Sequence, residues 1–198
     1  MTLRLLLTFI LATSLSGCAS STSIAQENRN PLVASRYGDM QADTLANLFI
    51  SKDPVTQEPG MKALIEKKID EAKTVSTNAR LLQQNGLMGL FIGIKEDVQG
   101  YALLLEKTLY FSSDFETKPG VNLHVYLTNA VDPRDVTFPD KTAIDLGEIQ
   151  SAYGAQQYTL PGNRKPESYR TVVLWDTVLK RSYSFSQLSK QAGLEQAQ

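Results

Sequence analysis

The sequence predicts a mainly β protein: an antiparallel β-sandwich or barrel-like domain of about eight strands over residues 86–190, preceded by an amphipathic α-helical arm over residues 36–85. Two observations support this prediction. After Gly86 the spacing of the apolar residues changes from three or four to two. Short alternating runs are then separated by turn-forming residues as far as Leu188. With 198 residues, 42% of them hydrophobic and 21% charged, the chain can build one such domain plus extensions.

Residues 1–17 have the order of a secretory signal peptide. Arg4 precedes an apolar run over residues 5–15, which is too short to remain in a bilayer as a spanning helix. The next segment, Leu15-Ser16-Gly17-Cys18, resembles the bacterial lipobox, whose cysteine becomes the acylated N-terminus. We therefore expect Cys18 to be lipidated and to anchor the chain to a membrane. The alternative is a conventional signal peptide cut nearby, which would remove Cys18 or leave it as a free thiol.

The resemblance to lipoproteins also implies a location in the cell envelope. Ala19 follows the cysteine, where lipoproteins of the inner membrane often carry Asp. The expected location is therefore the periplasmic face of the outer membrane, if the source is Gram-negative. Within the rest of the chain, residues 18–35 are rich in Ser, Thr, Asn and Gln and predict a flexible, lipidated tether. Residues 191–198 form a predicted C-terminal tail.

The composition excludes several kinds of chemistry. The chain has 20 basic and 21 acidic residues, so it lacks the positive field that nucleic-acid binding requires. A single Cys and a single His exclude an internal disulfide, a Cys/His zinc cluster and bis-histidine haem ligation. If Cys18 is acylated, no thiol remains for a nucleophile or a redox relay.

Two helices are predicted in the arm. Residues 43–50 suggest a short helix that ends before Asp53-Pro54. After Pro59-Gly60 comes a helix of about six turns that ends near Asn85-Gly86. Its apolar residues recur at spacings of three and four: Met61, Leu64, Ile65, Ile69, Ala72, Val75, Ala79 and Leu82. We expect this stripe to cover a face of the following domain. The alternative is a helix that docks into a groove of a partner.

Eight strands are predicted after the arm. They are LMGLFIGI, GYALLLE, KTLYFSSDF, VNLHVYLTN, TAIDLGEI, AQQYTLP, YRTVVLWD and RSYSFSQL. Strict alternation in Ser182–Ser186 predicts Tyr183 and Phe185 on one face, in the core, and all three hydroxyls on the other. The run Val172–Trp175 is apolar on both faces and predicts a central strand covered on each side, with the long helix as one candidate cover.

Four segments of the β-region occur in an order typical of one family: GVNLHVYL at 120–127, IDLG at 144–147, GAQQYTLP at 154–161 and VVLW at 172–175. Together they resemble the electron-transfer DM thirteen domain over about Leu87 to Leu188. The resemblance implies a secreted or surface β-module, often found beside DOMON domains. A redox role is proposed for that family because of a cysteine just after the tryptophan-containing strand. Here that position is Asp176, so only the fold is carried over.

Five residues are candidates for ligand binding. His124 and Tyr126 alternate with Leu123, Val125 and Leu127, so they are expected together on a surface or groove. Trp175 and Tyr158 either stack on a ligand or anchor the core, and the core is favoured. Asp176 is either a displaced functional group or, as we favour, an acceptor for amides of a turn.

The sequence gives weaker evidence for metal, nucleotide or hydrolytic sites. Asp132, Asp135 and Asp140 lie in one loop, but their spacing fits no EF-hand, and Arg134 and Lys141 lie among them, so no metal site is predicted. The chain has no phosphate-binding loop and no Gly-x-Ser-x-Gly motif. No carboxylate pair stands out for hydrolysis, so an enzyme is not favoured.

Two functional hypotheses therefore remain. The first is a membrane-anchored envelope lipoprotein whose β-domain is a non-catalytic module that binds an envelope protein or glycan. It needs no cofactor. The alternative is an extracytoplasmic electron-transfer component that holds haem or flavin, with His124 and either Met61 or Met88 as ligands.

Overall fold

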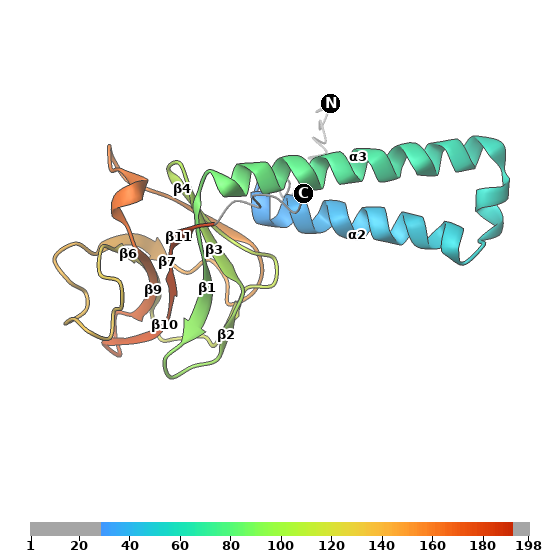
Figure 1. The fold of residues 1–198 in the computed structure, drawn as a ribbon. Helices are drawn as coiled ribbons and strands as arrows, with labels where there is room; N and C mark the ends of the chain where they lie inside the picture. Colours follow the sequence, from blue (N-terminus) through green and yellow to red (C-terminus); the bar gives the residue numbers. More distant parts are fainter. Residues whose placement is uncertain (1–28, 192–198) are drawn as a thin grey trace, which may run out of the picture.

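The computed structural model describes residues 29–191, which form a two-helix arm and an antiparallel sheet nearly closed into a barrel (Figure 1). The mainly β fold class is therefore confirmed. The predicted signal peptide, Cys18, residues 19–28 of the tether and residues 192–198 lie outside the described part. Neither helix of the arm combines the length and apolar content needed to cross a bilayer.

The first helix of the arm, α2 (Pro31–Ile50), is much longer than the predicted short helix. It begins within the segment assigned to the tether, so that assignment is wrong from Pro31 onward. The reason is local, because the Asn30 side chain accepts a hydrogen bond from the Leu32 amide at 3.0 Å and Pro31 takes the first helical position. Asn30 Nδ2 also donates to the Phe111 carbonyl at 2.7 Å, which fixes the start of α2 to the barrel.

The second helix, α3 (Pro59–Gln84), follows a 3₁₀ turn, η1 (Pro54–Gln57), and confirms the predicted long helix. The prediction that it covers a face of the barrel is wrong. It packs antiparallel on α2, and the pair projects away from the barrel (Figure 1). Small residues allow this pairing, because Gly38 of α2 lies directly against the backbone of Ala72 and Ser76. Of the predicted stripe, Ile65, Ile69, Ala72 and Ala79 are buried, whereas Met61, Leu64, Val75 and Leu82 are exposed.

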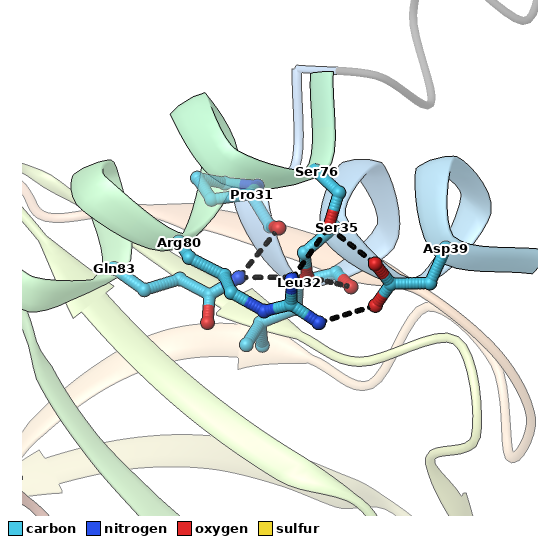
Figure 2. Close-up of polar contacts among 7 residues, drawn as sticks. All are labelled: Pro31, Leu32, Ser35, Asp39, Ser76, Arg80 and Gln83. Carbon is cyan, nitrogen blue, oxygen red and sulfur yellow. Dashed lines mark hydrogen bonds and ion pairs between the residues drawn. The ribbon is translucent and has the colours of Figure 1, made fainter. Parts of the chain in front are cut away.

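Polar contacts hold the arm together near the barrel (Figure 2). Ser76 Oγ donates to Asp39 Oδ1 at 2.6 Å, and Arg80 forms an ion pair with the same carboxylate. Gln83 Nε2 donates to the Pro31 carbonyl at 2.7 Å and to Ser35 Oγ at 2.9 Å. Because these bonds link the start of α2 to the end of α3, they close the base of the hairpin.

All eight predicted strands are present. They are β1 (Leu87–Gly93), β3 (Tyr101–Leu105), β4 (Thr108–Phe111), β6 (Leu123–Thr128), β7 (Ile144–Glu148), β8 (Gln156–Thr159), β9 (Thr171–Asp176) and β10 (Arg181–Gln187). Their order in the sheet is β7-β6-β9-β10-β1-β3-β4-β8. Three two-residue strands were not predicted: β2 (Val98–Gln99), β5 (Glu116–Thr117) and β11 (Ser189–Lys190). A 3₁₀ turn, η2 (Pro166–Ser168), precedes β9.

Side chains bridge the remaining gap between the end strands β7 and β8. The Gln150 amide donates to Gln156 Oε1 and to the Tyr158 hydroxyl, both at 3.1 Å. Gln150 Nε2 also donates to the Gln157 carbonyl at 2.7 Å. Residues of the β7–β8 connection thus replace part of the strand ladder that full closure would provide.

The sheet carries apolar clusters on both of its faces. The interior cluster includes Phe91, Phe111, Val125, Leu174 and Tyr183. The outer cluster comprises Phe138, Val173, Trp175 and Phe185. Strand β9 is buried on both faces, as predicted, but the loop that carries Phe138 covers its outer side instead of the long helix.

The predicted alternation along β10 is wrong. Ser182 pairs with Trp175 and Ser184 pairs with Leu174, so Tyr183 is the extra residue of a β-bulge. The bulge puts Tyr183 in the interior cluster and Phe185 in the outer one. Both rings are buried, as expected, but on opposite faces of the sheet.

The contact at Gly38 leads to a test of the arm. In Gly38→Ala the new Cβ would lie 2.6 Å from the Ala72 carbonyl oxygen and 2.9 Å from the Ser76 nitrogen, so the two helices must separate. We expect a loss of about 1–3 kcal/mol in the free energy of unfolding, measured by circular dichroism at 222 nm. Gly60→Ala is the matched control, because its Cβ meets nothing within 4 Å and its stability should be unchanged or slightly raised. Equal losses in both variants would contradict the packing.

Candidate functional site

Strand β6 presents two polar aromatic side chains on the outside of the barrel. Leu123, Val125 and Leu127 are buried in the interior, whereas His124 and Tyr126 are half-buried on the opposite face. The predicted alternation along this strand is therefore confirmed. His124 lies beside Trp175 of β9 on one side and beside Glu148 of β7 on the other.

His124 is oriented by a carboxylate. Its Nδ1 lies 2.9 Å from Asp145 Oδ2 and 3.0 Å from Oδ1. Asp145 Oδ1 also accepts from the Gly147 amide at 2.8 Å, which fixes the carboxylate in turn. Because the carboxylate accepts, Nδ1 carries a proton, and Nε2 is the ring nitrogen left to face a ligand.

Tyr126 completes this cluster, which we call the His124 cluster (His124, Tyr126 and Asp145). The His124 and Tyr126 rings lie 6.4 Å apart between centroids. Burial raises the pKa of Tyr126 to about 12, and the charge of Asp145 contributes to the rise. The Tyr126 hydroxyl therefore keeps its proton near neutral pH and remains a donor. The His124 cluster thus places two polar groups at the surface, next to aromatic rings.

Trp175 lies on the same outer face but beneath a loop. Its ring is 5.2 Å from the Phe138 ring, which also packs 5.6 Å from Tyr126. Arg134 from the same loop lies 5.1 Å over the ring of Phe185. Trp175 is only 8% exposed, so its surroundings are those of a core side chain.

Tyr158 faces the interior of the barrel, away from the His124 cluster. Its hydroxyl donates to Gln156 Oε1 at 2.6 Å and accepts from the Gln150 amide at 3.1 Å. Burial raises the pKa of Tyr158 to about 12. These bonds are part of the bridge between β7 and β8.

Asp176, at the end of β9, is fully buried and accepts four backbone hydrogen bonds. Oδ2 accepts from Val121 at 2.7 Å and Asn122 at 3.3 Å, and Oδ1 accepts from Val178 at 2.9 Å and Leu179 at 2.8 Å. Burial alone would raise the pKa of this carboxyl, but the four amides outweigh burial and hold the pKa below its usual range. The side chain therefore ties the segment before β6 to the β9–β10 turn.

The comparison with known families matches the barrel that carries these side chains. Residues 91–188, from β1 to the end of β10, match the family described as Electron transfer DM13. These residues form a DM13 domain. No curated protein and no solved structure matches the chain.

The DM13 description raises the question of which residues here would hold a redox group. Met88 lies on β1, which is separated from His124 on β6 by β10 and β9, about 14 Å at the usual strand spacing. Met61 lies at the start of α3, at the end of the arm remote from the barrel (Figure 1). Neither methionine can share one iron with His124, so these residues do not fit a haem site.

Two aspartates of the 132–140 loop, Asp132 and Asp140, are bonded locally. Asp132 forms an ion pair with Arg134, whose guanidinium holds the pKa of that carboxyl below its usual range. Asp140 accepts from the Thr142 amide at 2.7 Å and also bonds the Thr128 hydroxyl. Over residues 29–191 no three His, Cys, Asp or Glu side chains are grouped so that they could hold a metal ion.

Sequence reasoning missed two residues of this DM13 domain. Asp145 is 21 positions from His124, and only the pairing of β6 with β7 brings the two together. Phe138 lies in a loop with no periodicity, so its position over Trp175 had no sequence signal. The Asp145-Leu146-Gly147 motif was part of the family resemblance but did not indicate a partner for His124.

Replacing Phe138 tests the cover over Trp175. Phe138→Ala removes the ring that packs on Trp175, so we expect a loss of about 2–4 kcal/mol in the free energy of unfolding. Because Trp175 is the one tryptophan in the sequence, its fluorescence should shift to the red and acrylamide should quench it more strongly. Val136→Ala, an exposed change in the same loop, is the control and should leave the spectrum unchanged. An unshifted spectrum in Phe138→Ala would contradict the cover.

Replacing Asp176 tests its structural role. In Asp176→Asn an NH₂ group must face backbone donors, so we expect a loss of about 2–4 kcal/mol at pH 7, measured by urea unfolding. A carboxyl whose folded pKa lies below its unfolded value of about 3.9 stabilises the fold above that pH and loses this effect as the pH falls through the folded pKa. The difference between wild type and variant should therefore shrink below about pH 4.

The control for this experiment is Asp114→Asn, which changes an exposed carboxylate paired with Arg36. Its effect at pH 7 should be small. A loss in Asp176→Asn that is equally small, or one that stays constant down to pH 2, would argue against the four-amide assignment.

Proposed function

We propose that this chain is a membrane-anchored cell-envelope lipoprotein whose DM13 domain is a non-catalytic binding module for an envelope protein or glycan. The observation that carries the proposal is the bonding of Asp176. It occupies the position where the family resemblance places a redox cysteine, and its two oxygens are engaged by four backbone amides. Residues 29–191 contain no cysteine, so this part of the chain offers no thiol for redox chemistry.

The His124 cluster is the proposed contact surface. His124 Nε2 and the Tyr126 hydroxyl are the polar groups through which this surface can form hydrogen bonds with a ligand. The half-buried ring of Tyr126, which packs on the buried Phe138, gives a ligand an aromatic surface to pack on. This combination suits hydroxyl and amide groups, which glycans and protein backbones both present.

Lipidation at Cys18 would hold this surface close to a membrane. Eleven residues lie between Cys18 and Asn30, which is hydrogen-bonded to the barrel through the Phe111 carbonyl. Even a fully extended chain of that length spans only ~40 Å. The module would therefore meet ligands within a layer next to the membrane and would not diffuse away from it.

Photocrosslinking tests the contact surface. Glu148 is exposed and pairs with His124 across the strands, so a benzophenone amino acid placed there by Glu148→p-benzoylphenylalanine should capture a bound partner in intact cells. We expect adducts of higher mass at this position and at least a tenfold loss of adducts when His124→Ala is added, because the change removes the polar group at the surface.

The matched control places the same amino acid at Tyr153, which is strongly exposed and lies outside the His124 cluster. Few adducts are expected there. No adduct at position 148, or equal yields at positions 148 and 153, would refute the His124 cluster as the contact surface.

The alternative is an electron-transfer component that holds a redox cofactor, which the description of the DM13 family supports. Native and denaturing mass spectra of the protein purified from the envelope, with a visible absorption spectrum, separate the two functions. A binding module should have the mass of the lipidated chain and no visible absorption. A mass excess that is lost on denaturation, together with visible absorption, would favour electron transfer.

A further inference from the structure

The helical arm carries an exposed stripe that none of the contacts described above uses. On α3 the positions 61, 64, 68, 71, 75, 78 and 82 alternate in steps of three and four and so line one side of the helix. At 100° per residue this stripe lies roughly 90° around α3 from the face that packs on α2. Its apolar members are well exposed: Leu64 at 46%, Val75 at 40% and Leu82 at 50%. Lys68 and Glu71 form its charged centre.

The stripe is complementary to itself when two copies run antiparallel. If Lys68 of one copy faces Glu71 of the other, the same register places Leu64 opposite Val75, and each pairing occurs twice. In the centre of the stripe, charged residues thus meet opposite charges and Leu64 meets Val75, whereas Met61 faces Asn78 and Leu82 lies beyond the start of the other α3. In a parallel pair, Lys68 would face Lys68 and Glu71 would face Glu71, which is repulsive. The order of charges along α3 therefore favours the antiparallel arrangement.

The shape of the molecule allows this pairing. The arm projects from the barrel, so two arms can lie side by side with their barrels at opposite ends (Figure 1). We propose that α3 pairs antiparallel with α3 of a second copy of this chain.

Disulfide crosslinking of full-length chains in membranes tests the register. A chain with Leu64→Cys and a differently tagged chain with Val75→Cys are produced together and oxidised with copper phenanthroline. In the proposed register the two new cysteines face each other, so we expect a crosslinked dimer that carries both tags. The wild-type chain, whose one cysteine is Cys18, reports the background.

Each single variant produced alone is the matched control. In the antiparallel register two copies of position 64 lie 11 residues apart along the helices, about 16 Å, which is too far for a disulfide. Self-crosslinking of either variant would indicate parallel pairing and overturn the proposal. The absence of any crosslink above background, or a crosslink to a different protein, would overturn it as well.

A charge exchange tests the centre of the stripe. Lys68→Glu, added to both crosslinking chains, should lower the yield by about tenfold or more, because like charges then meet. Lys68→Glu combined with Glu71→Lys should restore the yield. Lys67→Glu is the control, because Lys67 also pairs with Glu71 within the chain but lies off the stripe. An unchanged yield in Lys68→Glu, or an equal loss in Lys67→Glu, would refute the charge pairing.

Discussion

The four hydrogen bonds to Asp176 are the constraint on which the rest of the barrel depends. They close the end of β9 against the segment that leads into β6, so they hold these two adjacent strands in one register. A side chain at Gly120 would place its Cβ 2.6 Å from Asp176 Oδ2, so glycine is needed at this approach. The register places His124 beside Trp175 and therefore assembles the proposed contact surface. The same bonds engage both carboxylate oxygens where the family resemblance places a thiol.

Burial of β9 on both faces determines what covers the barrel. The outer cluster around Trp175 needs an apolar cover, and the loop with Phe138 supplies it. Because that loop already covers the outer face of the sheet at β9, the two helices are not needed to cover it. They pair with each other instead, through Gly38 and the small residues of α3, and extend from the barrel. The loop that covers the barrel and the helical arm that projects from it therefore both follow from the way the outer face of β9 is buried.

The strands were predictable because alternating or continuous apolar runs between turn residues are local signals, and the eight strands display them within four to seven residues. The bulge at Tyr183 was not, because an extra residue in one strand is recognised only against its partner β9. The start of α2 had a local signal in Asn30-Pro31, but the polar composition before it obscured the boundary. The packing partner of α3 was predicted wrongly because an apolar stripe shows that a helix packs against something but does not show what it packs against. In the His124 cluster, the alternation along the strand was enough to predict that His124 and Tyr126 lie on the same face of the sheet. The contact of His124 with Asp145 could not be predicted, because it depends on the pairing of β6 with β7.

The central claim is that the position after the tryptophan strand is a structural carboxylate. The most direct measurement is a ¹³C NMR titration of the Asp176 carboxyl carbon between pH 2 and 7. Four amide donors to the ionised form predict a midpoint below the ordinary aspartate value of about 3.9. A midpoint at or above that value would mean that the amides do not hold the carboxylate, and the account of this domain as a structural binding module would lose its basis.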